Sequence, residues 1–228
     1  MPFLKKFIKL MKSELIPKHD KKRRNQWVID ESKYLHEEEI KKLKKEANKC
    51  RKYGLGHRKF TAIRNWFMVE LGLNTGLRVE EMTSLQGDSL LIDKDRSSIV
   101  VIGKGNKKRV VWISQDFKKT CCVYLDYKKS FGYSIGSEDY LLNNLKGGRI
   151  SKRALQKFFK IVIKRANLSN RYHIHNLRHT YTTFLLIASG RDYDFVSKQL
   201  GHTSIRTTQT YAGVVERIAR KAIEKMYK

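Results

Sequence analysis

The sequence predicts a mainly α-helical fold with one small antiparallel β-sheet (α+β), and three observations support this prediction. Beyond residue 34, apolar residues recur mostly at the three- and four-residue spacing of a helix. The two prolines stand at positions 2 and 17, so proline does not interrupt the later helices. Residues 98–113 combine two β-branched runs with a Gly/Asn/Lys turn, which is typical of a β-hairpin.

The first 33 residues differ in character from the rest. Apolar residues between Phe3 and Leu15 repeat at helical spacing among lysines, and Pro17 ends the pattern. We expect a basic amphipathic helix that docks on the protein itself or on a partner, with membrane-surface binding or targeting as the alternative. Residues 18–33 are polar and basic, as in a solvated tether or an arm that lies on nucleic acid. Residues 34–228 are expected to form the functional domain.

The first elements of that domain follow from apolar stripes and capping residues. A helix is expected over about 58–72, where four apolar residues share one face. Thr75 is expected to be the N-cap of the next helix, which would place Arg78 in its first turn. Three short strands are expected, at residues 89–93, 98–102 and 109–113.

Helices resume after the hairpin. Residues 151–166 carry apolar residues on one face and basic residues on the others. Residues 176–189 form the clearest helical pattern, and Gly190 is expected to end it. The remaining expected boundaries are Asp192 as the N-cap of a helix that Gly201 ends, a short helix after Ser204, and a final amphipathic helix over about 214–227.

Composition narrows the possible partners. The chain carries 49 basic and 22 acidic residues, a net charge of +27, and a folded domain with such an excess usually binds a polyanion such as nucleic acid. No apolar run approaches the ~20 residues of a membrane-spanning helix. The three cysteines show neither disulfide-framework nor zinc-finger spacing, so a reducing cytoplasm is expected.

Histidines and arginines cluster in residues 171–181, where either a metal or an anion could bind. His175 and His179 lie four positions apart, as zinc ligands can on a helix. However, no nearby carboxylate completes a ligand set, and Arg171 and Arg178 would repel a cation. An anion fits better, because His175 and Arg178 would both point at a phosphate near the start of a helix. No metal is therefore expected.

Four segments resemble the signature of one family when they are taken together. They are TGLRVEEMTSL (75–85), VVIGKGNKKRVVWIS (100–114), HNLRHT (175–180) and LGHTSIRTTQTYAGV (200–214). In this order they are similar to the boxes of the tyrosine recombinases, also called the phage integrase family, and most of all to Xer-type members. Each box alone is a weak signal, whereas the set is specific. The resemblance implies the fold of a tyrosine-recombinase catalytic domain.

The resemblance also implies an active site. It assigns seven residues: Arg78 and Arg178 as the clamp on the scissile phosphate, Lys104 as general acid, His175 as an aid to proton transfer, His202 as a hydrogen-bond partner of the phosphate, Tyr211 as nucleophile, and Glu81 as the support of the first arginine. Guanidinium groups suit the first task, because they remain charged at any working pH and donate in a planar fork. His173 and His179 are expected to be structural.

The implied function is that of a site-specific DNA recombinase or integrase. It would cleave and rejoin DNA strands through a 3′-phosphotyrosyl intermediate, with no metal, ATP or other cofactor. Two alternatives stay open. One is a DNA-binding regulator or accessory factor that has kept the fold, and the other is a type IB topoisomerase.

The expected partners follow from this function. They are double-stranded DNA and other protomers of the same chain, and no membrane partner is expected. The protein is expected to be a monomer in solution and a tetramer in the synapse. Its expected location is the cytoplasm, on the nucleoid when it is bound to DNA. Candidate DNA-backbone contacts are Lys107, Lys108, Arg109, Lys152, Arg153, Lys157 and Arg171. Typical members of the family also have a core-binding domain, for which the 33 residues before the catalytic domain are too few. We therefore expect a catalytic domain alone, a natural truncation or a fragment.

Overall fold

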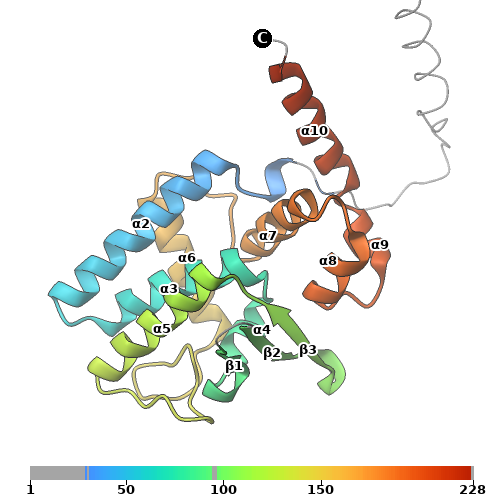
Figure 1. Ribbon diagram of the computed structural model, residues 1–228. Helices are drawn as coiled ribbons and strands as arrows, with labels where there is room; N and C mark the ends of the chain where they lie inside the picture. The colour runs from blue at the N-terminus through green and yellow to red at the C-terminus, as the bar shows by residue number, and fades with distance from the viewer. Residues whose placement is uncertain (1–28, 30, 94–96, 227–228) are drawn as a thin grey trace, which may run out of the picture.

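The computed structural model shows a helical body with one small sheet at its edge (Figure 1). It describes residues 29, 31–93 and 97–226. The side chains of Lys104 and of residues 221–226 are not among the described parts. The helices are η1 (Glu31–Lys33), α2 (Glu37–Gly56), α3 (Phe60–Thr75), α4 (Val79–Ser84), η2 (Gly87–Ser89), η3 (Lys104–Asn106), α5 (Gln115–Ser130), α6 (Lys152–Arg165), α7 (His175–Ala188), α8 (Tyr193–Leu200), α9 (Ile205–Gln209) and α10 (Ala212–Met226). The strands are β1 (Leu90–Leu91), β2 (Ser98–Ile102) and β3 (Lys108–Trp112). This confirms the predicted fold class. The amphipathic helix and basic linker expected before residue 29 lie outside the described residues.

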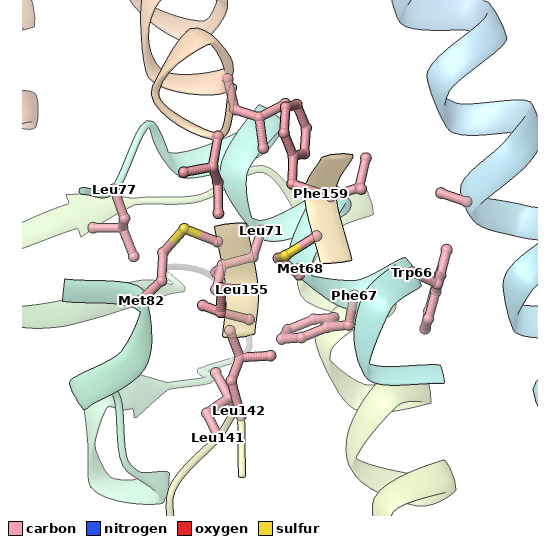
Figure 2. Packing of buried hydrophobic residues seen from close by; sticks show 14 of the residues in the cluster. Trp66, Phe67, Met68, Leu71, Leu77, Met82, Leu141, Leu142, Leu155 and Phe159 are labelled. Atoms are coloured by element: carbon pink, nitrogen blue, oxygen red, sulfur yellow. The ribbon is translucent and has the colours of Figure 1, made fainter. Parts of the chain in front are cut away.

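Helix α3 is the centre of the main hydrophobic core. It is apolar on nearly all sides and packs against α2, α5, α6 and α7. Phe67 stacks on Tyr124 of α5 with ring centroids 3.8 Å apart and nearly parallel planes. Figure 2 shows how Met68 and Leu71 of α3 meet Leu155 of α6 in this core. Because protein interiors are close-packed, a central helix buried all round gives the neighbouring site residues a rigid base.

The sheet has the strand order β1-β2-β3, and both pairings are antiparallel. Ser98 pairs with Trp112 and Ile102 pairs with Lys108, so the turn of the β2–β3 hairpin lies at residues 103–107. Alternate residues Ile99, Val101 and Val111 point into the core, as the period of two predicts. The hairpin therefore carries its basic turn away from the body while its inner face is anchored.

A second, smaller apolar cluster lies between α7, α8 and the start of α10. Its buried members are Ile29, Tyr34, Leu186, Val196, Leu200, Tyr211, Val214 and Val215. The backbone N–H of Ile29 also donates to the carbonyl of Thr210 at 3.3 Å. The segment just before α2 thus packs beside Tyr211, while α10 extends away from the body (Figure 1).

Several predicted boundaries are confirmed and one is wrong. Ser151, Asp192 and Ser204 each accept a backbone N–H at the start of a helix, as N-caps do. Thr75, however, is the last residue of α3 rather than the N-cap of α4. Its hydroxyl donates to the carbonyl of Leu71, and Gly76, with φ +60°, then ends α3. A left-handed C-cap of this kind favours glycine, so the local sequence ends one helix here before the next begins.

None of the helices among the described residues is both long enough and apolar enough to cross a membrane.

Candidate active site

Arg78 stands at the N-cap of α4, in the extended stretch that follows Gly76. Its backbone N–H donates to Oε2 of Glu81 at 2.8 Å, and its guanidinium donates to Oε1 of Glu81 at 3.1 Å. The side chain is 43% exposed, so the guanidinium keeps access to solvent. Glu81 therefore fixes both ends of Arg78, which supports the role that the sequence analysis gave to this acid.

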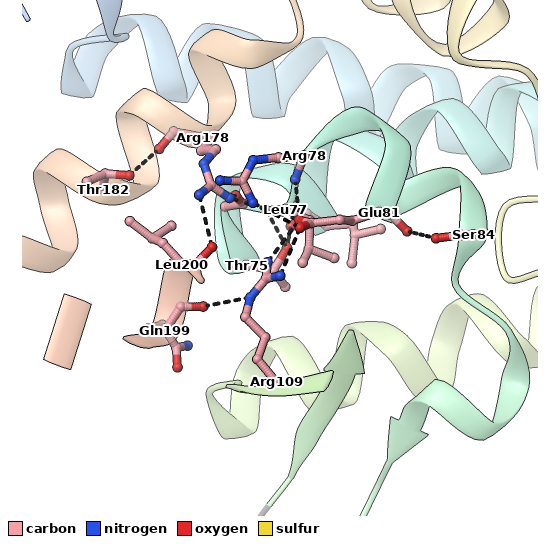
Figure 3. A network of polar contacts seen from close by, with 12 residues as sticks. Thr75, Leu77, Arg78, Glu81, Ser84, Arg109, Arg178, Thr182, Gln199 and Leu200 are labelled. Carbon is pink, nitrogen blue, oxygen red and sulfur yellow. Dashed lines mark hydrogen bonds and ion pairs between the residues drawn. The ribbon is translucent and has the colours of Figure 1, made fainter. Parts of the chain in front are cut away.

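Glu81 is the centre of a network of three arginines (Figure 3). Arg109 donates to both carboxylate oxygens, at 2.8 and 2.9 Å, while Arg178 lies 4.0 Å away. Burial would raise the pKa of Glu81, but the hydrogen bond and charge of Arg109 outweigh it, so that the pKa is lowered. Three positive groups around one negative group leave an excess of positive charge, which is what a phosphate site requires.

Arg178 lies in the first turn of α7 and is only 3% exposed. Its guanidinium donates to the carbonyl of Gly76 at 2.8 Å and to the carbonyl of Leu200 at 2.9 Å. Burial and the nearby charge of Arg78 lower the pKa of Arg178, yet the ordinary pKa of a guanidinium is so high that the group stays cationic at neutral pH. Arg178 thus joins the ends of α3 and α8 through one planar group.

Arg109 is the predicted DNA contact that points inward. Its side chain is largely buried against Glu81, and its Nε donates to the carbonyl of Gln199 at 3.4 Å. A side-chain carbon placed on Gly201 would lie 2.6 Å from Cδ of Arg109, closer than real contacts allow. Arg109 is therefore better placed to hold Glu81 and the end of α8 than to reach a DNA backbone. This role could not be predicted from local sequence, because Glu81 lies 28 residues away in the chain.

The two predicted site histidines both lie close enough to Arg178 for its charge to act on them. His175 is the first residue of α7 and is exposed, whereas His202 follows the left-handed Gly201 and shares a hydrogen bond of 2.8 Å between its Nδ1 and Oγ1 of Thr208. The surrounding protein and the charge of Arg178 lower the pKa of His175. Burial and the charge of Arg178 lower the pKa of His202 to about 3. Both rings are consequently neutral at pH 7 before an anion enters.

Tyr211 lies between α9 and α10, in the second apolar cluster, and is 4% exposed. Burial raises the pKa of its phenol to about 12, although the nearby hydroxyl of Thr182 and the charge of Arg178 act in the other direction. The phenolic oxygen is 2.6 Å from Nδ1 of His179. The sequence analysis regarded His179 as structural, and only its position one turn after His175 could have drawn attention to it.

These side chains meet in one cavity of about 570 Å³. Its walls include five of the seven predicted catalytic residues, which come from three of the four family-like segments: Arg78, His175, Arg178, His202 and Tyr211. His179 and Arg206 also line it, and Glu81 lies behind Arg78. Lys104 has its backbone in the hairpin turn, and its side chain is outside the described residues. The cavity is thus rich in cationic and neutral donors around one phenol.

The other candidate DNA contacts lie outside the cavity. Lys107 and Lys108 are exposed on the hairpin, and Lys152, Arg153 and Lys157 are exposed on α6. The ammonium of Lys152 donates to Glu80 at 3.1 Å. Arg171 is exposed, and it donates to the hydroxyl of Tyr172 at 2.9 Å.

The fold and the cavity are matched by one protein family. The model of the phage integrase family matches residues 33–217, and this chain belongs to that family. The chain is 34% identical to the tyrosine recombinase XerC of Caldanaerobacter subterraneus subsp. tengcongensis over 163 residues, which are 71% of this chain and 44% of that protein. It is 31% identical to XerC of Staphylococcus epidermidis over 188 residues, which are 82% of this chain and 59% of that protein. The chain therefore spans about half the length of these curated relatives.

Solved structures show the same fold. The XerH site-specific recombinase in its post-cleavage complex with a palindromic difH substrate is similar with a TM-score of 0.68 at 22% identity, over 86% of this chain and 53% of that chain. The catalytic domain of bacteriophage HP1 integrase is similar with a TM-score of 0.54 at 20% identity, over 84% of this chain and 93% of that domain. The arrangement of helices and hairpin seen here is thus that of tyrosine-recombinase catalytic domains.

Proposed function

We propose that this chain carries out site-specific DNA recombination, with residues 34–228 as the catalytic domain and residues 1–33 as an N-terminal segment and linker. The observation that carries this proposal is the cavity in which Arg78, Arg178, two histidines and Tyr211 converge. Membership of the phage integrase family supports it. The substrate would be double-stranded DNA and the place of action the cytoplasm, on the nucleoid.

The chemistry assigned to the cavity is a transesterification. The phenolic oxygen of Tyr211 attacks the phosphorus of a DNA phosphodiester, the P–O5′ bond breaks, and the departing O5′ takes up a proton. We assign that proton to the ammonium of Lys104, because its turn belongs to a hairpin anchored beside the site. The product is a 3′-phosphotyrosyl ester and a free 5′-hydroxyl. A 5′-hydroxyl of another strand can reverse the step and restore the phenol, so the bond energy is kept.

The surrounding groups stabilise the transition state. The guanidinium of Arg78 is open to solvent, and that of Arg178 is fixed by two carbonyls, so the first can move to a nonbridging oxygen while the second is already in place. His175 and His202 are neutral and can each donate one ring N–H to the phosphate. The raised pKa of Tyr211 means that the phenol is still protonated when DNA binds. It loses its proton as its oxygen attacks phosphorus, and we assign the transfer of that proton toward solvent to His175, whose ring is neutral and exposed.

The test is a covalent adduct. A nicked duplex whose sequence this protein has selected from a randomised library would release a short oligonucleotide upon cleavage, leaving the protein on the 3′ end. We expect an adduct on a denaturing gel with the unaltered protein and none with Tyr211→Phe. An adduct that persists in Tyr211→Phe would falsify the assignment. Tight binding without any adduct would point to a DNA-binding regulator, and relaxation of supercoiled DNA without sequence preference would point to a topoisomerase.

A second prediction concerns the exposed basic residues of the hairpin and α6. If Lys107, Lys108, Lys152, Arg153 and Lys157 each neutralise one phosphate, the logarithm of the binding constant falls with the logarithm of salt concentration with a slope of about −4 to −5. Lys157→Gln is expected to reduce this slope by about 1. Lys119→Gln, an exposed lysine on α5, serves as the matched control and leaves the slope unchanged. Equal slopes for Lys157→Gln and the unaltered protein would remove α6 from the DNA interface.

Partner protomers are part of the same proposal. α10 extends from the body, and its first turns bury Val214 and Val215 beside Tyr211. We propose that protomers assemble on DNA, as a tetramer in the synapse, from monomers in solution.

A further inference from the structure

The buried face of the cavity contains one side chain that the proposed reaction does not use, that of His179. His179 lies in the second turn of α7 and is buried, and its Nδ1 is 2.6 Å from the phenolic oxygen of Tyr211, which comes from a segment 32 residues further along the chain. The His175 and His179 rings meet edge to face, with centroids 4.6 Å apart. His179 is therefore held between a rim histidine and the nucleophile.

The direction of the hydrogen bond depends on the charge and on the tautomer of His179. Burial and the neighbouring His175 and Arg178 lower the pKa of His179 to about 3, so its ring is neutral at working pH. A neutral imidazole can accept at one nitrogen, whereas an imidazolium could only donate at both. In the tautomer of His179 that carries its hydrogen on Nε2, the phenol of Tyr211 is the donor and Nδ1 of His179 is the acceptor.

This direction matters for a nucleophile. A phenol has one hydrogen, and a hydrogen given to His179 cannot be given to a phosphate oxygen. The lone pairs of the phenolic oxygen remain for attack on phosphorus. The same bond opposes rotation of the side chain, which is otherwise held by the apolar contacts of the second cluster.

We propose that His179, with its ring hydrogen on Nε2, is a positioning residue for Tyr211: by accepting the phenolic hydrogen at Nδ1, it holds the phenolic oxygen in the cavity of the two arginines with its lone pairs free. This inference rests on the proposed function, in which Tyr211 is the nucleophile. It adds to the site a residue that makes no contact with DNA and acts only through the tyrosine.

Two substitutions separate this role from simple packing. His179→Asn keeps an acceptor close to the place of Nδ1, and His179→Leu fills similar space without one. His173→Asn is the matched control, since His173 is exposed and its Nδ1 contacts the carbonyl of Arg171 at 3.1 Å. Thermal unfolding of each variant shows whether it is folded before activity is compared.

The rate of adduct formation at saturating DNA is the first readout. We expect His179→Leu to be about 100-fold slower, the loss typical of a misplaced reacting group, with an unchanged dissociation constant for DNA. His179→Asn is expected to recover most of that loss, and His173→Asn to match the unaltered protein. A normal rate in His179→Leu overturns the proposal, as does a His179→Asn that is as slow as His179→Leu.

The second readout needs no cleavage. A fluorinated tyrosine at position 211 reports by its ¹⁹F chemical shift whether the phenol is hydrogen-bonded. The shift is expected to move in His179→Leu and to stay near its original value in His179→Asn. An unmoved resonance in His179→Leu overturns the inference, whereas an unaltered protein that forms no adduct overturns the proposed function instead.

Discussion

Replacing Glu81 by glutamine is expected to lower the free energy of unfolding by about 3–5 kcal/mol, because it leaves a cluster of buried and half-buried guanidiniums without their counter-charge. Arg109 loses the carboxylate whose two oxygens it contacts at 2.8 and 2.9 Å, and Arg178 loses the only acid near it among the described residues. The backbone N–H of Arg78 also loses a carboxylate acceptor. Chemical denaturation measured at neutral pH is the direct check.

Glu80→Gln is the matched control for this prediction. Glu80 is the neighbouring residue, but its side chain is 66% exposed and pairs with the exposed Lys152, so its loss is expected to cost at most about 1 kcal/mol. Equal losses in the two variants would mean that the arginine network does not depend on a buried carboxylate.

The same carboxylate predicts a pH dependence. The pKa of Glu81 is lowered in the folded protein, so its contribution to stability is fully present above the unfolded value of about 4.3 and is lost as pH falls through the folded value. The difference in stability between the unaltered protein and Glu81→Gln is therefore expected to shrink upon acidification. A difference that stays constant down to strongly acidic pH would contradict this linkage.

Replacing Arg178 by lysine is expected to slow strand cleavage by about 10²–10³-fold, the usual effect of removing one preorganised donor from an anionic transition state. Lysine keeps the charge but presents a single ammonium, which cannot bond the carbonyls of Gly76 and Leu200 and a phosphate in the same fork geometry. The measurement is the single-turnover rate of adduct formation on the selected nicked duplex.

Arg58→Lys is the control for that substitution. Arg58 lies in the exposed turn between α2 and α3, and the same chemical change is expected to leave the rate as it was. If Arg178→Lys cleaves at the unaltered rate, the charge alone suffices, and the rigid fork has no part in the reaction.

The sequence predicted those features that local signals encode. The helix that begins near His175, the position of the hairpin and the caps at Asp192 and Ser204 all follow from residues within one or two turns. A candidate catalytic set could be named from the sequence because the resemblance is carried by four short segments, and five of its members line one cavity.

The remaining features depend on contacts between distant segments. The inward turn of Arg109 depends on Glu81 of α4, and the partner of His179 lies beyond two further helices. The period of two in a strand predicts which face Arg109 shares with Val111, but it does not predict that the carboxylate of Glu81 is buried on that face. Thr75 was misplaced for a different reason, since a threonine can cap a following helix or end a preceding one, and Gly76 decides between them.

One consequence concerns Gly201 and Arg109. The backbone at position 201 has φ +65°, and the stem of Arg109 passes through the space that any side chain there would fill. The two positions cannot vary independently: while the hairpin keeps its arginine, the residue before His202 must remain without a side chain. A change from Gly201 to alanine would push the guanidinium of Arg109 away from the carboxylate of Glu81. A substitution next to His202 would thus disturb the arginine network through a steric conflict with Arg109.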